Sequence, residues 1–223
     1  MKTIRPVAIF RSPLKSKFGI PRQSGIARHL RGSIILEPEY RSPDALRGLE
    51  DFDYLWLVWG FSANKHETTG VTVRPPRLGG NERMGVFATR SPFRPNGLGL
   101  SSVRIAGIEL SAPDGPVIHV EGADLMDGTP IYDIKPYLPY VDAHPDARGG
   151  FTETTSWQPL KVEMPESVAA LFSAEEAEAL REVLANDPRP QYHHDPARIY
   201  GMPFAARDVK FRVADGVVIV VEA

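Results

Sequence analysis

Hydrophobic positions in the first 140 residues fall in short runs and alternations, not at helical spacing. Ile118 and Val120, for example, alternate with His119 and Glu121, as in a strand with one buried face. Turn-forming glycine and proline separate the runs, and no long amphipathic helix intervenes, so the rhythm of a parallel nucleotide-binding sheet is missing. Closure into a barrel would hide the strand edges. The pattern predicts strands at 7–10, 33–37, 54–61, 71–74, 85–88, 98–108 and 117–121, and one short helix at 43–49.

The pattern changes after Tyr140, where A-H-P-D-A-R-G-G-F indicates a domain boundary. A helix is expected to begin near Ser173, because Glu176 stands where a capping box needs it, and to stop at Asp187-Pro188. Alternating residues on both sides of Asp215-Gly216 predict a C-terminal hairpin. We therefore expect a mainly β protein with a single-sheeted closed β-barrel domain at 1–142 and a small α+β domain at 143–223.

Composition narrows the class of protein. The chain has 223 residues, 42% of them hydrophobic and 24% charged, as in ordinary soluble globular proteins. The longest apolar run, 54–61, is far shorter than the roughly 20 residues of a membrane helix. Arg5, Pro6 and Arg11 interrupt any secretory apolar stretch, and cysteine is absent, which excludes disulfides and thiolate chemistry. A cytoplasmic location is the expectation.

Charge is divided unevenly along the chain. Residues 1–100 hold 16 basic and 8 acidic side chains (+8), whereas 101–223 hold 10 and 20 (−10), which together give the net charge of −2. This asymmetry favours a polyanion as partner of the first half. The alternative is that the two halves neutralise each other inside the protein.

The segment 71–101, V-T-V-R-P-P-R-L-G-G-N-E-R-M-G-V-F-A-T-R-S-P-F-R-P-N-G-L-G-L-S, is rich in arginine. Between Arg74 and Arg94 it has five arginines, no lysine and one acid, Glu82. Arginine offers a planar fork of donors that suits carboxylate, phosphate and base edges, which a lysine ammonium does not. The segment therefore indicates directional recognition of an anion. The alternative is a structural loop whose arginines pair with surface acids.

Several common chemistries are excluded. No G-x-G-x-x-G opens a helix after a strand, and no P-loop motif occurs. His193-His194-Asp195 lacks helical spacing and a fourth ligand nearby, so we predict no metal site.

A second dense segment is 124–140, D-L-M-D-G-T-P-I-Y-D-I-K-P-Y-L-P-Y. Asp127-Gly128-Thr129-Pro130 is turn chemistry, and a purely structural role for Asp127 is as plausible as a functional one. Asp133, Lys135 and Tyr137 follow among prolines, which presents an acid, a cation and a phenol from a stiff backbone. A third segment of interest, 15–23, joins two predicted strands with basic and amide side chains.

These three segments, including K-F-G-I-P-R-Q at 17–23, resemble the TrmO family of tRNA methyltransferases. The later D-P-R-P-Q-Y, at 187–192, resembles that family's C-terminal signature, so the resemblance spans almost the whole chain. It implies an S-adenosylmethionine-dependent enzyme on a single-sheeted β-barrel, acting as a homodimer. The expected reaction is methylation of the exocyclic amine of N6-threonylcarbamoyladenosine beside the anticodon of a threonine tRNA.

The resemblance also implies positions for the cofactor contacts. Two of them, Ser62 and Ala63, stand where relatives have His-Gln, which puts their side-chain roles in doubt. The form R-P-N-G-L-G also differs from the commoner R-P-N-P-I-G, a change that should alter loop stiffness more than chemistry. The cofactor contacts carried over are Pro21, Arg22, Gln23, Ser62, Ala63, Arg90, Leu100, Leu125, Met126, Asp127 and Gly128.

The expected chemistry assigns further roles. Methyl transfer needs nucleophile, methyl carbon and sulfur in line, so positioning and exclusion of water supply much of the effect. Asp127 would suit the polar end of the cofactor, and Asp133 is the hypothetical acceptor of the amine proton, unless it only pairs with Lys135. Arg74 or Arg77 would read the threonyl carboxylate. The predicted substrate and tRNA contacts are Arg74, Arg77, Arg94, Lys135, Tyr137, Arg189, Tyr192 and Tyr200.

Alternatives remain open at this point. The C-terminal arginines and tyrosines, Arg198 included, are equally well read as surface arginines and core tyrosines. The protein could also be a non-catalytic tRNA-binding barrel, or a small-molecule enzyme or cofactor-sensing regulator on the same scaffold.

Overall fold

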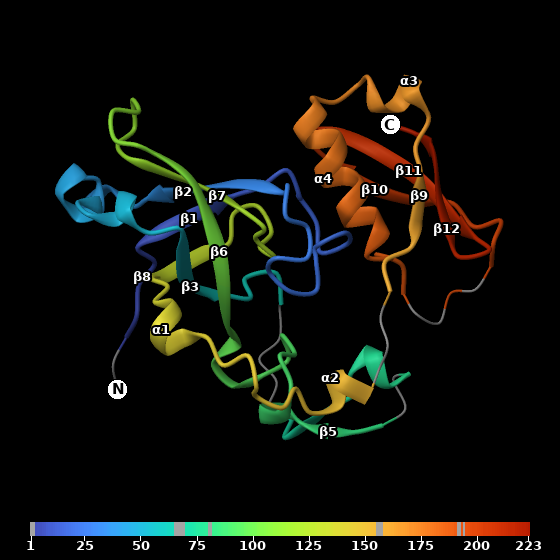
Figure 1. Ribbon diagram of the computed structural model, residues 1–223, viewed down its shortest axis with the longest axis horizontal. Helices are drawn as coiled ribbons and strands as arrows, with labels where there is room; N and C mark the ends of the chain where they lie inside the picture. Colours follow the sequence, from blue (N-terminus) through green and yellow to red (C-terminus); the bar gives the residue numbers. More distant parts are fainter. Residues whose placement is uncertain (1–2, 65–69, 80–81, 155–157, 191–192, 194) are drawn as a thin grey trace.

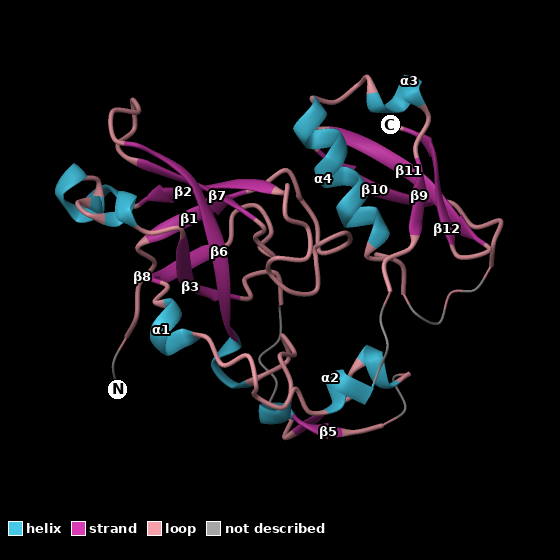
Figure 2. Ribbon diagram, viewed as in Figure 1, coloured by secondary structure: helices cyan, strands magenta, loops and turns pink. Residues whose placement is uncertain are grey.

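Six antiparallel strands close into a barrel in the computed structural model, which describes residues 3–64, 70–79, 82–154, 158–190, 193 and 195–223 (Figures 1 and 2). The closure confirms the predicted mainly β barrel. Around the barrel the order is β1 (Ala8–Arg11), β2 (Arg31–Leu36), β7 (Val117–Glu121), β6 (Leu98–Glu109), β3 (Tyr54–Gly60) and β8 (Pro130–Pro136), which pairs with β1 again.

Alternation along the strands builds the barrel core. On β3, Leu55, Leu57 and Trp59 point inward and are buried, while Tyr54 is exposed. They meet inward side chains of the other strands, such as Phe10 and Ile118. Each fully buried side chain of this kind contributes about 1.5–3 kcal/mol relative to an exposed one, so this single cluster accounts for much of the stability of the barrel.

Three local expectations were wrong in detail. Strand β8 was not predicted because prolines bound it, yet Pro130 and Pro136 stand at its two ends, where a missing N–H costs least. The strand expected at 85–88 is only β5 (Met84–Gly85), which pairs with β4 (Thr72–Val73) before a 3₁₀ turn. The helix expected at 43–49 is two 3₁₀ turns, because Gly48 adopts φ 84° between them. The 3₁₀ turns are Pro38–Tyr40, Pro43–Leu46, Leu49–Asp51, Pro76–Leu78, Val86–Ala88 and Pro95–Gly97.

The C-terminal part forms a second sheet with a helix packed on it, as the α+β expectation required. Its strand order is β10 (Tyr200–Phe204), β11 (Arg207–Ala214), β12 (Val217–Glu222) and β9 (Lys161–Glu163), with β9 parallel to β12. Helix α4 (Ala174–Ala185) begins with the predicted capping box of Ser173 and Glu176. The hairpin around Asp215-Gly216 is also present, whereas β9 and β10 were not predicted. The remaining short helices are α1 (Pro139–Asp142), α2 (Phe151–Thr154) and α3 (Glu166–Ala169).

The connection between β1 and β2 joins the two parts of the molecule. Leu14, Ala27 and Leu30 from this connection lie in the same buried cluster as the C-terminal sheet and α4. Phe18 stacks on Tyr200 and Phe211, with ring centroids 6.3 and 6.2 Å apart. The segment K-F-G-I-P-R-Q therefore packs on the C-terminal core, although the connection to which it belongs begins and ends at barrel strands.

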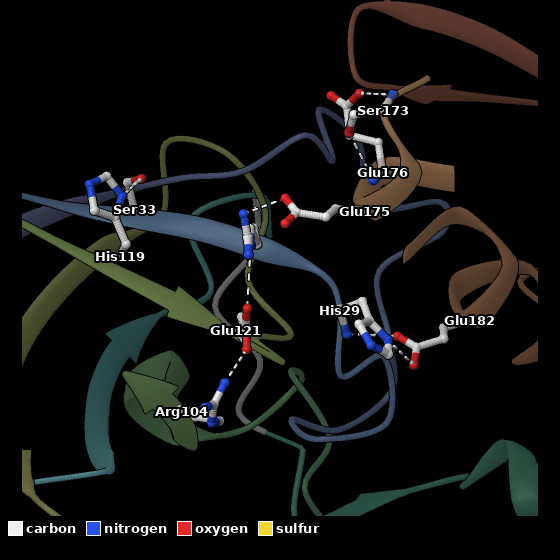
Figure 3. A network of polar contacts seen from close by, with 10 residues as sticks. His29, Ser33, Arg104, His119, Glu121, Ser173, Glu175, Glu176 and Glu182 are labelled. Carbon is white, nitrogen blue, oxygen red and sulfur yellow. Dashed lines mark hydrogen bonds and ion pairs between the residues drawn. The ribbon is translucent and has the colours of Figure 1, made fainter. Parts of the chain in front are cut away.

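Polar contacts reinforce this junction (Figure 3). Glu182 of α4 accepts from the backbone N of His29 and pairs with its ring nitrogen, both at 2.8 Å. The hydrogen bond with Glu182 raises the pKa of His29. Arg31 pairs with Glu175 of α4 and, at 3.3 Å, with Glu121. Part of the charge asymmetry is thus neutralised between the two halves, as the alternative interpretation supposed.

Candidate functional site

A pocket of about 180 Å³ lies where β3 ends. Its walls come from four separate segments: Lys17 and Ile20 of the β1–β2 connection, residues 59–64, Pro92 of the arginine-rich segment, and Asp124, Met126 and Thr129 before β8. The three segments singled out in the sequence therefore meet here within one chain, together with the end of β3.

Side-chain hydrogen bonds tie these segments together. Lys17 Nζ donates to Asn64 Oδ1 at 2.7 Å, and Asn64 Nδ2 donates to the carbonyl oxygen of Pro92 at 3.2 Å. Arg90 Nη1 donates to Gln23 Oε1 at 2.5 Å, which joins two of the predicted cofactor contacts. The pocket is therefore a pre-formed junction of loops held on a rigid barrel, the usual position of a ligand site.

Nine of the eleven predicted cofactor residues divide into three groups. Ser62, Ala63 and Met126 line the pocket. Gln23 and Arg90 contact each other, and Pro21 and Arg22 adjoin Gln23 in the connection that supplies Ile20. Leu125 is fully buried and Leu100 is 57% exposed on the outer surface, so neither lines this pocket.

Asp127 faces a different region. Its carboxylate accepts from Ser12 N at 3.1 Å and Lys15 Nζ at 2.8 Å, and it lines an open groove of about 880 Å³ shared with Arg11 and His119. Partial burial alone would raise the pKa of Asp127, but the hydrogen bonds from Lys15 and Ser12 hold this pKa below its ordinary value. The carboxylate thus bonds to residues that follow β1 and not, as expected of the turn, to the next amides: Gly128 N donates to the carbonyl oxygen of Phe10 and Thr129 N to that of Met126.

Asp124 is a pocket residue that sequence reasoning missed. It accepts a hydrogen bond from Ser101 Oγ at 2.5 Å, and Ser101 Oγ accepts from Trp59 Nε1 at 2.9 Å, so the buried Ser101 links two residues of the pocket wall. Burial raises the pKa of the Asp124 carboxyl, and the Ser101 hydrogen bond and the nearby Arg90 only partly oppose it. Its place as the first residue of the D-L-M-D-G-T-P motif was the available signal, but its partner Ser101 lies 23 residues away in the sequence.

The raised pKa of Asp124 predicts a pH-dependent effect of Asp124→Asn. A carboxyl whose pKa is higher in the folded than in the unfolded state makes the fold less stable above that folded pKa, and this penalty disappears below the unfolded value of about 4. Asparagine keeps an oxygen for Ser101 and carries no charge. The variant should therefore match or exceed the wild type in urea unfolding at pH 8 and lose any advantage near pH 4. A variant clearly less stable at pH 8 would contradict this account.

Asp133 lies on the outer face of the barrel. Its side chain is 48% exposed, and its Oδ2 is 3.1 Å from Lys135 Nζ, the pairing that the sequence left as an alternative. Asp133 is not among the residues that line the pocket. It is the cross-strand neighbour of Val58, which pairs on its other side with Leu100, so Asp133 and Leu100 share one outer face of β8, β3 and β6. Tyr137, farther along this face, packs on Trp56 with ring centroids 5.6 Å apart.

The predicted tRNA contacts are dispersed. Tyr200 is 6% exposed and packed on Phe18, so its ring has the core role and is not presented to a base. Arg189 Nε pairs with Asp187 at 2.9 Å, and Arg94 Nη1 donates to the carbonyl oxygen of Thr89 at 2.9 Å. Arg198 lies over the Tyr200 ring at 5.4 Å, and Arg74 is exposed. Tyr192 and the side chain of Arg77 lie outside the described residues.

Metal-binding clusters and membrane spans are both absent from the described ranges. There, no group of three or more histidine, aspartate or glutamate side chains is arranged to hold a metal ion. No helix in the same ranges has the length and apolarity needed to span a membrane.

Comparison with known proteins gives a consistent result. Residues 9–143 match the tRNA-methyltransferase O N-terminal domain and residues 157–223 the TrmO C-terminal domain. A tRNA (adenine(37)-N6)-methyltransferase of Escherichia coli is 39% identical over 217 residues, 94% of this chain and 92% of the relative. A Pseudomonas aeruginosa relative, whose name refers to S-adenosylmethionine-dependent methyl transfer, is 40% identical over 93% of this chain and 90% of its own length. The crystal structure of TrmO from Pseudomonas aeruginosa superposes with a TM-score of 0.81 at 33% identity, covering 100% of this chain and 97% of the other. The chain therefore belongs to the tRNA-methyltransferase O family.

Proposed function

We propose that this protein is an S-adenosylmethionine-dependent tRNA methyltransferase. Its substrate would be the N6 amine of N6-threonylcarbamoyladenosine next to the anticodon of threonine tRNA. The observation that carries the proposal is the meeting of three family-like motifs at one pre-formed pocket. Membership of the family, whose relatives include tRNA (adenine(37)-N6)-methyltransferases, supports the reaction class.

The residues of the pocket fit part of the cofactor. Ile20, Trp59 and Met126 offer apolar walls for an adenine ring, and Asp124 offers a carboxyl to a cationic group. The Arg90–Gln23 pair, whose guanidinium lies near enough to Asp124 to act on its pKa, supplies donors for a carboxylate. Since a volume of about 180 Å³ is below the roughly 300 Å³ of drug-sized sites, the remainder of the cofactor would lie outside the pocket along this pair. When bound, S-adenosylmethionine supplies an electrophilic methyl group.

The chain's own contribution would be positioning and proton transfer. Bulky apolar walls exclude water from the transfer path, and the fixed loops hold the amine in line with the methyl group. Arg74, exposed in the arginine-rich segment, would pair with the threonyl carboxylate. Asp133 is the proposed acceptor of the amine proton, with substrate lying along the face it shares with Leu100.

Paired substitutions test the role of Asp133. If Asp133 accepts the proton, Asp133→Asn should lower kcat by roughly 100-fold with unchanged cofactor affinity. Lys135→Met removes the ion pair and leaves the carboxylate; since Lys135 is also a predicted tRNA contact, this variant should raise KM for tRNA but retain most of kcat. Full turnover of Asp133→Asn, or equal losses of kcat in both variants, would show that Asp133 pairs with Lys135 and does not accept the amine proton.

Methyl transfer itself can be assayed with purified protein. Labelled S-adenosylmethionine and threonine tRNA carrying the threonylcarbamoyl group should yield labelled RNA, and mass spectrometry should find one added methyl on the modified adenosine. The same tRNA without that group should bind more weakly, and Arg74→Ala should remove the difference. Binding without labelling would favour a non-catalytic tRNA-binding barrel, and absence of tRNA binding would favour a cofactor-sensing regulator.

Two further parts of the proposal concern the cellular location and the oligomeric state of the protein. We propose a cytoplasmic homodimer, which light scattering would detect as twice the chain mass. Exposed apolar side chains on the barrel and the arginine-rich segment, such as Leu100, Val71 and Tyr54, support an assembly that covers them. A monomer at micromolar concentration with full activity would contradict the dimer and leave the methyltransferase proposal intact.

A further inference from the structure

Phe93 is an exposed aromatic residue next in sequence to a residue of the pocket wall. Its side chain is 51% exposed, and the residue before it, Pro92, is part of the pocket wall. Because consecutive Cα atoms are about 3.8 Å apart, a molecule that enters the pocket past Pro92 comes within reach of an exposed ring at the next residue.

The loop that carries Phe93 is held rigidly. Phe93 N donates to Ser91 Oγ at 3.1 Å, and Ser91 N donates to Thr89 Oγ1 at 3.3 Å. The carbonyl oxygen of Pro92 accepts from Asn64, and that of Thr89 accepts from Arg94. Because the main chain is tied at both sides of Phe93, little backbone entropy remains to be lost when its ring binds a partner.

The charge around Phe93 favours nucleic acid over a protein partner. Arg83, Arg90 and Arg94 lie within ten residues of Phe93, and the segment 71–101 contains a single acid, Glu82. An exposed aromatic ring within an arginine-rich segment matches a single-stranded RNA loop, whose bases stack on aromatic rings while arginines meet its phosphates. A protein surface docking on Phe93 would have to desolvate these cations or supply acids to pair with them.

We propose that Phe93 is a base-stacking positioning residue, which holds a base of the RNA loop, either the target adenine or its neighbour, at the mouth of the pocket. The inference rests on the proposed tRNA substrate and adds the residue that orients it. Stacking on Phe93 fixes the plane of the base, so the exocyclic amine meets the methyl donor in one orientation.

The test compares Phe93→Leu, Phe93→Trp and the control Phe87→Leu. Phe87 is 80% exposed in the same segment and is not part of the pocket wall. Methylation of a modified anticodon stem-loop should show kcat/KM about 5- to 100-fold lower for Phe93→Leu, the range expected for one lost stacking contact. Phe93→Trp should stay near the wild type, Phe87→Leu within about twofold, and S-adenosylmethionine affinity should be unchanged throughout.

A second readout separates this inference from the proposed function. With 2-aminopurine beside the target adenine, RNA binding to the wild type should change its fluorescence, and Phe93→Leu should lose this change. Binding without methylation would refute the proposed activity, while the fluorescence comparison would still decide the role of Phe93. Wild-type kinetics and fluorescence in Phe93→Leu would overturn the inference. A change of oligomeric state or of cofactor affinity in Phe93→Leu that accounts for its lost methylation would also overturn the inference, because the ring would then serve protein packing.

Discussion

Gly99→Ala should weaken S-adenosylmethionine binding at least tenfold and destabilise the barrel by about 1–3 kcal/mol, the usual cost of overpacking. Gly99 is the cross-strand partner of Trp59, and a β-carbon at Gly99 would lie 2.4 Å from the indole Cε2. The indole must therefore move, yet it forms a wall of the pocket and donates to Ser101, which in turn holds Asp124. Calorimetric titration of the cofactor and urea unfolding measure the two effects.

Gly107→Ala is the matched control on the same strand, because a β-carbon there would have no atom within 4 Å. It should leave both measurements near the wild type. Combining Gly99→Ala with Trp59→Phe should restore part of the stability, since the phenyl ring lacks Cζ2, the indole atom 2.5 Å from the new methyl group. Unchanged cofactor affinity in Gly99→Ala would show that Trp59 is not part of the cofactor site.

Gly19→Ala should have a comparably large effect through the other side of the site. Gly19 adopts φ 95°, and a β-carbon there would lie 2.1 Å from Met202 Sδ in the C-terminal core. We expect about 1–2 kcal/mol for the left-handed backbone and a further 1–3 kcal/mol for the clash. Because Lys17 and Ile20 flank Gly19 and line the pocket, cofactor affinity should fall together with stability.

Gly25→Ala isolates the backbone contribution. Gly25 lies in the same connection at φ 77°, and a β-carbon there would meet no atom within 4 Å. Its substitution should therefore cost only about 1–2 kcal/mol and leave cofactor affinity unchanged. If both alanine variants bind the cofactor like the wild type, the C-terminal core does not position this connection for cofactor binding.

Strict patterns in the sequence predicted much of the fold. The alternation of Ile118 and Val120 with His119 and Glu121 marked a barrel strand, and the spacing of Ser173 and Glu176 marked the start of α4. Strand β8 was missed because its terminal prolines and its charged outward residues suggest a loop, while its pairing with β1 and β3 involves partners distant in the sequence. Such strands are specified by tertiary pairing more than by local preference.

The site was less accessible from sequence than the fold. Resemblance singled out the segments that meet at the pocket, but only the three-dimensional arrangement separates Met126, which lines it, from Asp127, which turns to Lys15. The importance of Asp124 follows from its hydrogen bond with Ser101, which lies 23 residues away in the sequence and is brought to it only by the fold. Phe18 is apolar within a basic loop, which indicates that this loop packs on a core. The stacking of Phe18 on Tyr200 also explains why Tyr200 is buried.

A crystal structure with S-adenosylhomocysteine bound would test the proposed cofactor site most directly. We expect its adenine ring among Ile20, Trp59 and Met126, with the amino-acid end directed toward Gln23 and Arg90. Ligand in the open groove beside Arg11 and His119, or no binding at millimolar concentration, would contradict this assignment.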